Sequence, residues 1–453
     1  MKLQEIIQDK NRLFTEKDVP EVYLSDPFYH EVAKACAVAL PVSTEEVRKL
    51  VTFANENNLT IIARGGGTGV AGAQVPVNGG ELIIDLQKMN RILALDEETM
   101  TLTVEPGVQL QEIQAFVEDK GYFYPPDPGS KHSTIGGNVA TNAGGMRAVK
   151  YGTTRDYVRE LDVVLPDGKG LTLGSLNIKS SSGYDLKNLF IGSEGTLGII
   201  TGIKLKVLPL PAYKKSVLMA FDTLADATRG VLNILKSGID PTALELFDRP
   251  TISYSESFTK QKLHSQQGEA YVLMTIDSND ETIISGKIPV IENAVKNIAL
   301  EVLPLTETEE REAWHLRDNI LVALMQFTQY DMLDEVVPIN RFAEMIEYTK
   351  ELQEKHQITV VNFGHAGDGN IHTVLMRETL DEDTWQERRA AFLDDLYKKV
   401  TELGGLPSAE HGIGIAKRKY FEQMTSPVEI EVMRKIKKVI DPDNRLNPGK
   451  VFS

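Results

Sequence analysis

Two short glycine-containing segments hold three of the eight histidines of this 453-residue sequence. The segment GHAGDGNIH carries His365 and His372, and the segment SAEHGIG carries Glu410 and His411. Glycines in the first segment disfavour a helix, so we expect His365 at the end of a strand and His372 on the strand that returns. Two imidazoles and a carboxylate, from His365, His372 and Glu410, could hold a divalent metal ion with an open position.

An open position would make that metal a Lewis acid able to bind a substrate oxygen. His411 directly follows the predicted ligand Glu410 and could act as a general base. The alternative for each histidine taken singly is a partly buried side chain bonded to the backbone. Asp368 could ligate or orient a ligand, but its place between two glycines favours a cap of its own turn.

One arginine, Arg317, is the candidate for binding an acidic substrate. It lies on a predicted helix beside the apolar residues Leu316 and Ile320. From there its guanidinium could hold a carboxylate through two parallel hydrogen bonds. Taken alone, the sequence favours the alternative, a helix arginine whose charged end is in water.

A long segment of small residues, from Pro125 to Gly152, forms a second candidate site. It contains six glycines and three prolines but few large apolar side chains, so it cannot build a core of its own. Glycines let backbone N–H groups approach a ligand closely, and successive amides can bind an anion. The composition therefore predicts a phosphate-bearing cofactor, and the alternative is a long mobile surface loop.

A shorter loop, RGGGTGVAG from Arg64 to Gly72, contains the dinucleotide pattern GxGxxG. In a Rossmann fold this pattern must open a helix whose N-terminus faces the pyrophosphate. Pro76 and the strand-like residues 81–86 leave no room for such a helix. We therefore predict a strand, a glycine loop and a second strand, with backbone amides forming an anion site.

The surrounding sequence predicts the elements that carry these segments. Residues 1–35 indicate one or two short helices, and Pro209 and Pro211 indicate a domain boundary. Between them we expect helices at 42–57, with a capping box at Ser43 and Glu46, and at 110–120. We expect strands at 60–63, 81–86, 91–95, 101–105 and 203–208, and a hairpin around Pro166-Asp167-Gly168.

Residues 212–410 alternate strands with longer helices, which predicts an α+β layer with helices on one face of an antiparallel sheet. The expected strands are 216–221, 243–247, 271–276, 300–305, 333–337, 359–363 and 371–375, and the expected helices are 222–237, 307–328, 341–356 and 382–403. A capping box at Ser426 opens a last helix that ends near Ile440. The turn-rich end, residues 444–449, is expected to return to the cofactor.

Composition limits the class of protein. The length predicts two or three domains, and a net charge of −16 argues against a protein that coats nucleic acid. The single cysteine, Cys36, excludes an internal disulfide framework and suits the cytoplasm. We expect no transmembrane segment because no apolar run approaches the ~20 residues of a membrane span. Docking at the inner membrane face stays open.

These stretches together resemble the FAD-dependent 2-hydroxy acid dehydrogenases of the vanillyl-alcohol oxidase/p-cresol methylhydroxylase superfamily. The resemblance is greatest to the branch of the glycolate oxidase D subunit, FAD-linked D-lactate dehydrogenase and D-2-hydroxyglutarate dehydrogenase. Seven motifs in order carry it across nearly the whole chain: RGGGTG at 64–69, PPDPGS at 125–130, IGGNVATNAGG at 135–145, GSEGTLGIIT at 192–201, GHAGDGNIH at 364–372, SAEHGIG at 408–414 and LNPGK at 446–450.

The resemblance implies an α+β protein. Its expected parts are a two-lobed FAD-binding domain of the p-cresol methylhydroxylase (PCMH) type, an α+β cap domain with an antiparallel sheet, and a short C-terminal helical return. The expected boundaries are 1–35 for an N-terminal helical segment, 36–211 for the FAD-binding domain, 212–410 for the cap that holds substrate and metal, and 411–453 for the segment returning to the FAD domain.

Motif position implies roles for individual residues. His365, His372 and Glu410 match the family's metal ligands, a set that suits Zn, Mn or Fe. His411 matches its proposed base, and Arg317 matches its substrate-carboxylate arginine. The residues expected to contact FAD are Arg64, Gly65, Gly66, Gly67, Thr68, Gly69, Pro126, Asp127, Ser133, Thr134, Gly136, Gly137, Asn138, Asn142, Gly144, Gly145, Gly152, Glu194, Gly195, Ile200 and Asn447. Those of 64–69 and of 133–145 would hold the pyrophosphate, and Glu194, Gly195 and Ile200 would lie near the adenosine half.

Two departures from the family pattern bear on cofactor and substrate. Gly67 stands where some members of the superfamily tether FAD through a histidine, so we expect non-covalent FAD. Met332 and Val374 stand where the D-2-hydroxyglutarate branch has a lysine and an asparagine. Without that cationic and amide pair, the distal carboxylate of a five-carbon diacid would be poorly bound. This favours a small monocarboxylate, D-lactate or glycolate.

The reaction that the resemblance implies is oxidation of a D-2-hydroxy acid to its 2-keto acid, with the hydride passing to flavin N5. Electrons would go on to a non-NAD acceptor such as a quinone or an electron-transfer flavoprotein, or to oxygen. The alternatives are a D-2-hydroxyglutarate dehydrogenase, a flavin-holding, non-catalytic subunit of a glycolate oxidase complex, and a zinc hydrolase that would be colourless. The expected assembly is a homodimer or part of an oxidase complex.

Overall fold

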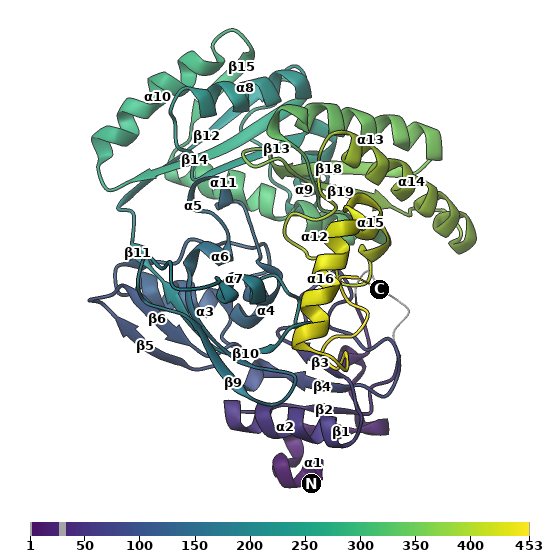
Figure 1. Cartoon of the computed structure of the whole chain (residues 1–453). Coiled ribbons are helices and arrows are strands. Elements are labelled where there is room, and N and C mark those ends of the chain that lie inside the picture. Colours follow the sequence, from purple (N-terminus) through teal and green to yellow (C-terminus); the bar gives the residue numbers. More distant parts are fainter. Residues whose placement is uncertain (1, 27–32, 453) are drawn as a thin grey trace. The chain divides into compact units, whose positions relative to one another are not determined.

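The computed structural model describes residues 2–26 and 33–452, which form two compact units (Figure 1). The first unit comprises Met1–Gly145, Gly152–Leu210 and Glu410–Ser453, and the second comprises Met146–Tyr151 and Pro211–Ala409. The sequence placed the main domain boundaries after residues 211 and 410. The two units divide after residues 210 and 409.

A four-stranded sheet in the order β1-β2-β4-β3 forms part of the first unit. Strands β2, β4 and β3 are parallel, and β1 is antiparallel to β2. Helix α2 begins as predicted after Ser43, whose hydroxyl accepts from the Glu46 N–H at 3.2 Å, and it buries Leu50 in one cluster with Ile61 and Leu82. The bounds are β1 (Leu13–Thr15), β2 (Ala37–Ala39), α2 (Thr44–Glu56), β3 (Ile61–Arg64), β4 (Leu82–Asp85) and the 3₁₀ turn η4 (Leu86–Lys88).

The glycine loop from Arg64 to Gly72 behaves as predicted. It leads from β3 toward the parallel strand β4, and no helix lies in the described residues between these strands. The GxGxxG pattern is therefore not part of a Rossmann unit.

The N-terminal segment contains less helix than predicted. Its elements are α1 (Leu3–Ile6), β1 and three 3₁₀ turns, η1 (Lys10–Arg12), η2 (Glu16–Asp18) and η3 (Glu21–Tyr23). The helical segment expected over 1–35 is corrected accordingly, because residues 13–15 pair with the edge of β2. Residues 27–32 of that expected segment lie outside the described residues.

A second, fully antiparallel sheet has the order β5-β6-β10-β8-β9. The hairpin predicted around Pro166-Asp167-Gly168 joins β8 to β9, with the Leu165 N–H donating to the Lys169 carbonyl at 2.8 Å. The bounds are β5 (Ile92–Asp96), β6 (Thr101–Val104), α3 (Leu110–Glu118), β8 (Val158–Val164), β9 (Gly170–Gly174), α7 (Leu186–Phe190) and β10 (Ile199–Lys206), and β7 (Tyr122–Phe123) pairs with β11 (Leu208–Pro209).

The small-residue segment from Pro125 to Gly152 contains helix as well as loop. The first helix, α4 (Ile135–Thr141), buries Ile135 and Val139 and ends where Asn142 adopts a left-handed conformation. The next two are α5 (Ala148–Tyr151) and α6 (Thr154–Tyr157). The two apolar side chains are one helical turn apart and anchor α4, a helix that the composition of the segment did not predict.

One large antiparallel sheet, in the order β15-β12-β14-β13-β18-β19-β16, forms the centre of the second unit, and β17 also pairs with β19. Its strands are β12 (Tyr213–Phe221), β13 (Ala243–Asp248), β14 (Ala270–Ser278), β15 (Ala299–Pro304), β16 (Tyr330–Met332), β17 (Glu335–Val336), β18 (Thr359–His365) and β19 (Asn370–Met376). The helices are α8 (Leu224–Lys236), α9 (Arg249–Thr259), α10 (Glu281–Val295), α11 (Glu307–Asp318), α12 (Ile320–Met325), α13 (Phe342–His356) and α14 (Glu382–Glu402), with the 3₁₀ turn η5 (Ile339–Arg341).

Helices cover both faces of this sheet, whereas the sequence predicted one covered face. On β18, Val361 and Phe363 pack in one apolar cluster with residues of α9, α11 and α12. The Asn362 amide between them donates to Thr349 of α13 at 2.9 Å. Successive side chains of a strand point to opposite faces, so α13 lies across the sheet from α11. Strands buried on both faces carry no polar alternation, which explains the missed layer.

The predicted helix 307–328 is broken at Asn319. Its side-chain amide donates to the His315 carbonyl at 2.8 Å and so competes with the helical pattern, and α12 starts at the next residue. Helices α9 and α10 and strand β16 were not predicted.

The C-terminal residues return to the first unit through α15 (Arg418–Met424) and α16 (Pro427–Ile440). Lys437 and Asp441 hold this return: the Lys437 ammonium donates to the Thr196 and Leu446 carbonyls at 2.7 and 2.8 Å and pairs with the Asp441 carboxylate. Asp441 also accepts from the Arg445 and Leu446 N–H groups. Within the described part of the chain, no helix has the length and apolar character that crossing a membrane requires.

We expect Asp441→Ala to lower the midpoint of thermal unfolding strongly. The substitution leaves the Lys437 charge buried without its carboxylate, a change that costs about 3–5 kcal/mol. The matched control is Asp443→Ala in the same turn, where the side chain is 71 % exposed. Equal midpoints for both variants, measured by circular dichroism, would contradict the assignment.

Candidate functional site

The hairpin of β18 and β19 positions the two histidines as the sequence predicted. His365 is the last residue of β18, and His372 lies on the returning strand. The tight turn depends on Gly369, which has φ +85° and whose N–H donates to the His365 carbonyl at 3.1 Å. The Asp368 carboxylate accepts from the Asn370 N–H at 3.3 Å, so Asp368 caps its own turn as expected.

The two imidazoles are neighbours, with ring planes at 89° to each other. The His365 and His372 Nε2 atoms lie 3.4 Å apart, and both side chains are buried. The Nδ1 atom of His365 lies 2.7 Å from the carboxylate of Glu245, its register partner on β13. A carboxylate at Nδ1 favours the tautomer protonated there, which leaves the His365 Nε2 lone pair directed toward His372.

The same carboxylate holds Arg317 of α11. Its Nε and Nη2 atoms lie 2.8 and 2.5 Å from the second oxygen of Glu245, and its guanidinium stands 5.7 Å from the ring centre of Phe363. Arg317 is thus neither solvated nor isolated: it shares one buried partner with His365. Burial alone would raise the pKa of Glu245, but Arg317 and His365 outweigh it and lower that pKa to about 2.

Asp334 organises the segment that leads to Glu410. Its side chain accepts from the Ser408 hydroxyl at 2.6 Å, from the Ala409 N–H at 3.0 Å and from the Asn370 amide at 3.0 Å. Since Asn370 belongs to the His365–His372 turn, Asp334 ties that turn to the SAEHGIG segment.

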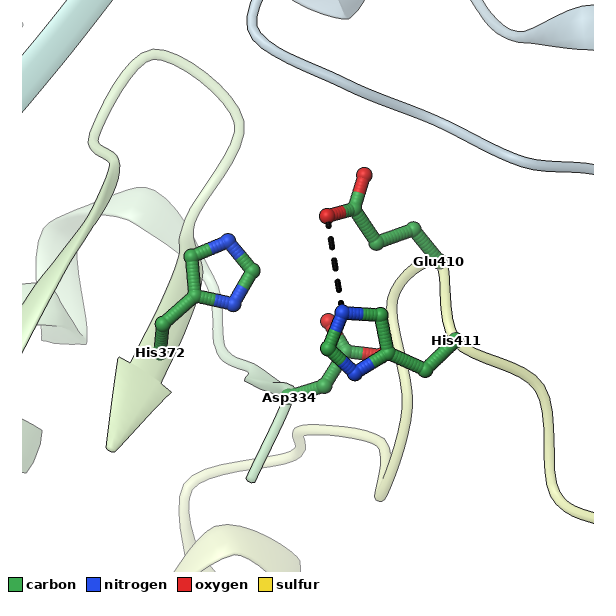
Figure 2. A group of neighbouring side chains, drawn as sticks. All are labelled: Asp334, His372, Glu410 and His411. Carbon is green, nitrogen blue, oxygen red and sulfur yellow. Dashed lines mark ion pairs between the residues drawn. The ribbon is translucent and has the colours of Figure 1, made fainter. Parts of the chain in front are cut away.

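Four side chains could hold a metal ion: Asp334, His372, Glu410 and His411 each offer one ligand atom, and these atoms lie within 4.8 Å of one another (Figure 2). Glu410 and His411 are near each other in Figure 2, with His411 Nε2 3.8 Å from a Glu410 oxygen. His365, predicted as a ligand, is not in this group of four, but its Nε2 is the neighbour of His372 Nε2. The grouping brings together two of the three predicted ligands, the predicted base and an aspartate that was not predicted.

The Nε2 atoms of His365 and His372 are spaced as two ligands of one divalent metal would be. Two ligands that bind one tetrahedral ion at about 2.1 Å lie roughly 3.4 Å from each other, which matches the separation of the His365 and His372 Nε2 atoms. Imidazole nitrogens with one or two carboxylates suit Zn, Mn or Fe.

At two glycines of the first unit, neighbouring loops pack too closely to leave room for a side chain. A Cβ on Gly65 would come 2.4 Å from the Thr134 hydroxyl, which accepts from the Gly66 N–H at 3.1 Å. Gly145 has φ +126° and leaves no space for a Cβ beside the Asp127 carbonyl. Glycine is therefore required at both positions, and loops rich in glycine offer backbone N–H groups that can bind an anion such as a pyrophosphate.

Arg64 stabilises the first glycine loop from inside. Its buried guanidinium donates to the Val22 carbonyl at 2.9 Å and the Gln74 carbonyl at 3.4 Å, and lies 5.1 Å from the Tyr23 ring centre. Burial lowers the pKa of Arg64, and the nearby Asp85 opposes this effect.

Glu194 and Asn447 join three parts of the first unit. The buried Glu194 carboxylate accepts from the Ile413 and Gly414 N–H groups at 2.8 Å each. The Asn447 amide donates to the Glu194 carbonyl at 2.7 Å and accepts from the Ala63 N–H at 2.9 Å. These contacts place the end of the chain beside Ala63 and Glu194, next to the glycine loop that was predicted to bind FAD, and the Glu194 carboxylate holds the loop after His411.

The other residues expected at FAD also belong to this unit, where they lie on loops, on α4 and, for Ile200, on β10. Buried members are Pro126, Asp127, Ser133, Thr134, Gly136, Asn138, Gly144, Gly145, Gly195 and Ile200, and half-buried members are Gly65, Gly66, Gly67, Gly137, Asn142 and Gly152. Thr68 and Gly69 are exposed.

Glu245 and Asp334 were missed in the sequence, although each left a trace there. Glu245 is the only charged residue of ALELF, and Asp334 follows the apolar Leu333 in a predicted strand. A charge within a buried strand requires a partner. The partners could not be named because they are remote in the chain.

Comparison with known proteins identifies close relatives over nearly the full chain. It is 40% identical over 442 residues to a D-lactate dehydrogenase of Anaerostipes hadrus, covering 94% of this chain and 93% of that one. It is 38% identical to the glycolate oxidase subunit GlcD of Bacillus subtilis, covering 95% and 91%. A D-2-hydroxyglutarate dehydrogenase of Stutzerimonas stutzeri is 31% identical, with 98% and 97% covered.

Two family models match consecutive parts of the chain. The model for the FAD binding domain matches residues 35–174, and the model for the C-terminal domain of FAD linked oxidases matches residues 210–451. Among solved structures, substrate-bound p-cresol methylhydroxylase superposes with a TM-score of 0.81 at 17% identity, covering 99% of this chain and 95% of that one. The fold is therefore the PCMH type.

Lys450, in the last motif LNPGK, is a buried lysine whose protonation should make stability depend on pH. The buried Lys450 ammonium donates to the Gly72 and Val75 carbonyls at 2.7 Å each. Burial lowers the pKa of Lys450 from 10.5 to about 7, against the opposing charges of Glu81 and Glu194. Between these values the unfolded chain holds a proton that the folded chain has lost, so folding becomes more favourable as pH rises.

We therefore expect the stability of the wild type, relative to Lys450→Met, to increase between pH 7 and pH 10 by on the order of a few kcal/mol. Thermal unfolding of both proteins at several pH values measures the difference. Lys435→Met, at a side chain 70% exposed, is the control and should show no such trend. A constant difference between wild type and Lys450→Met would rule out the perturbed lysine.

Proposed function

We propose a reaction on the premise that this chain belongs to the family of FAD-linked oxidases and is an oxidoreductase. The reaction is oxidation of a small D-2-hydroxy acid to the 2-keto acid, with FAD and a divalent metal. The observation that carries the proposal is the convergence of Arg317, His365 and His372 on one face of the second unit's sheet. A guanidinium for a carboxylate and two imidazoles for a metal are the groups that such a substrate requires.

His365, His372 and Glu410 would hold the metal, and Asp334 would be either a fourth ligand, through an oxygen, or the anchor of the Glu410 segment. When bound, the ion supplies a Lewis acid for the oxygens of the hydroxy acid. Non-covalent FAD, held by the loops of residues 64–69 and 133–145, supplies the acceptor for two electrons and the C2 hydrogen.

Arg317 would bind the substrate carboxylate. Its Nε and Nη2 atoms already bond Glu245, so the Nη1 and Nη2 end of the guanidinium is the edge that can receive a carboxylate. Placing the substrate through this ion pair fixes the position of its C2 atom.

His411 would take the hydroxyl proton. It lies beside Glu410 in the four-residue group, so a substrate oxygen near that group would be within its reach. The loop that follows is held by Glu194, which limits the movement of His411.

The substrate is proposed to be D-lactate or glycolate. Met332 and Val374 are directly paired on β16 and β19, and both belong to the apolar cluster that also contains Phe363. An apolar wall offers no partner to a second carboxylate, whose burial without one would be costly. D-2-Hydroxyglutarate is the alternative.

A second candidate function is supported by the similarity to a glycolate oxidase subunit: a flavin-holding subunit that does not itself oxidise substrate. In either case the electrons are proposed to leave to a quinone or an electron-transfer flavoprotein, in the cytoplasm or at the inner membrane face.

Anaerobic mixing of the purified flavoprotein with single hydroxy acids tests the choice. We expect D-lactate or glycolate to bleach the flavin band. L-Lactate should fail, because with its carboxylate and hydroxyl at the same two sites its C2 hydrogen would point away from the flavin. Faster bleaching by D-2-hydroxyglutarate would select the alternative substrate. No bleaching by any member of the panel would favour the non-catalytic subunit.

His411→Ala should retain FAD and slow anaerobic flavin reduction by a factor on the order of 10² to 10⁴, the usual contribution of a general base. Stopped-flow absorbance measures the rate. The control is His264→Ala, an exposed histidine of the second unit that pairs with Glu312. Reduction at the wild-type rate would remove His411 from the base role.

A further inference from the structure

We infer that Glu245 is a positioning residue that connects the substrate-binding arginine to the metal-binding histidines. This inference rests on the proposed function and adds a residue to it. One buried carboxylate orients Arg317 through one oxygen and His365 through the other. The two halves of the substrate site are thereby set by a single side chain.

The division of the two oxygens supports this role. Oε1 lies 2.7 Å from His365 Nδ1, and Oε2 lies 2.8 Å from Arg317 Nε. Glu245 is 1% exposed, so water does not compete for either oxygen. Both contacts are charge-assisted and lie in a region of low dielectric, where such bonds are stronger than at a surface.

The sheet makes the arrangement rigid. Glu245 lies on β13, in register with Leu273 of β14 on one side and His365 of β18 on the other. A residue in the middle of a paired sheet cannot shift without breaking ladder hydrogen bonds on both sides. The carboxylate is therefore a fixed reference for the two groups it holds.

The contact with His365 determines which ring nitrogen can bind a metal. With Nδ1–H donating to Glu245, Nε2 is the acceptor and faces His372 Nε2 at 3.4 Å. Carboxylate partners of this kind hold the ring orientation of metal-binding histidines and raise their basicity.

The contact with Arg317 determines how a substrate can approach. Glu245 covers the Nε and Nη2 edge, and the Phe363 ring lies 5.7 Å from the guanidinium carbon. The remaining Nη1 and Nη2 end also has Asp318, 56% exposed, at 3.8 Å. A substrate carboxylate is thus directed to the end of the guanidinium.

Only glutamate meets both requirements. A glutamine that accepts from His365 would turn its NH₂ group toward the Arg317 donors, and the reverse orientation would set that NH₂ against the His365 N–H. Aspartate is one methylene shorter and would release one of the two partners.

The test compares Glu245→Gln with Glu256→Gln. Glu256 lies in the same unit, is 3% exposed, and pairs with Arg249 at 2.7 Å and Lys262 at 2.8 Å. The pKa of each carboxylate is lowered to about 2. Both substitutions therefore remove a buried, paired charge, but Glu256 contacts no residue of the proposed site among its described hydrogen bonds.

The full-length flavoprotein, treated with a chelator, is titrated with Zn²⁺ and with Mn²⁺, and metal uptake is measured by elemental analysis. We expect Glu245→Gln to raise the metal dissociation constant about 10- to 100-fold, and to raise the KM for the most reactive hydroxy acid about tenfold or more. Glu256→Gln should lower the unfolding midpoint while leaving both values within about twofold of wild type.

Three results would overturn the inference, and they are distinguishable. Wild-type metal affinity and KM in Glu245→Gln would remove the role of Glu245 while leaving the proposed function intact. Equal losses in Glu245→Gln and Glu256→Gln would reduce the effect to general destabilisation. A wild type that binds neither metal would remove the proposed metal site together with this inference.

Glu245→Asp provides a second variant if Glu245→Gln does not fold. It keeps the buried charge and one of its two partners, so we expect it to fold, but its shorter reach should still weaken metal binding or raise KM by at least about fivefold. Wild-type values for both quantities would again overturn the inference.

Discussion

A carboxylate inside the sheet of the second unit governs the geometry around it. Glu245 is surrounded by apolar strands, and an isolated ionised carboxylate there would carry a large desolvation cost. Two donors meet this cost, the Arg317 guanidinium from α11 and the His365 imidazole from the neighbouring strand. Both donors are thereby brought into the same buried space, and the helix is fixed against the sheet. The ion pair and hydrogen bond that stabilise the buried Glu245 carboxylate therefore also position Arg317 and His365, the groups proposed to bind the hydroxy acid and the metal.

In the first unit, the loops are held in place by buried side chains that hydrogen-bond to main-chain atoms. Arg64, Lys450 and Asn447 donate to main-chain carbonyls in or beside the glycine loops, those of Gln74, Gly72 and Glu194, and Glu194 accepts from main-chain N–H groups of residues 413 and 414. Loops of small residues have few apolar contacts to order them, so buried polar side chains take over that task. The C-terminal residues supply several of these side chains, which explains why the chain returns to this unit after its second unit is complete.

The apolar neighbours of the arginine shape the proposed selectivity. Phe363, Met332 and Val374 share one buried cluster, and the first of these also lies under the guanidinium. A substrate carboxylate at Arg317 would therefore lie beside the Phe363 ring, with the two histidines near the same Glu245 carboxylate. Substrates with a short, uncharged remainder fit such surroundings, whereas a second charge would need a partner that the cluster does not supply.

Much of this could be read from the sequence because it depends on residues near each other in the chain. The β18–β19 turn, the Asp368 cap, the Ser43 cap and the strand-loop-strand unit after Arg64 follow from local spacing of glycines, polar residues and apolar runs. The cofactor class and the fold type followed from motifs.

The contacts of Glu245 with Arg317 and His365 join residues 72 and 120 positions apart in the sequence, and the contact of Asp334 with Ser408 joins residues 74 positions apart. Strand order and register bring those groups together. The sequence of a strand that is buried on both faces does not indicate which strands pair with it. Only the tertiary structure could show which buried charges are partners.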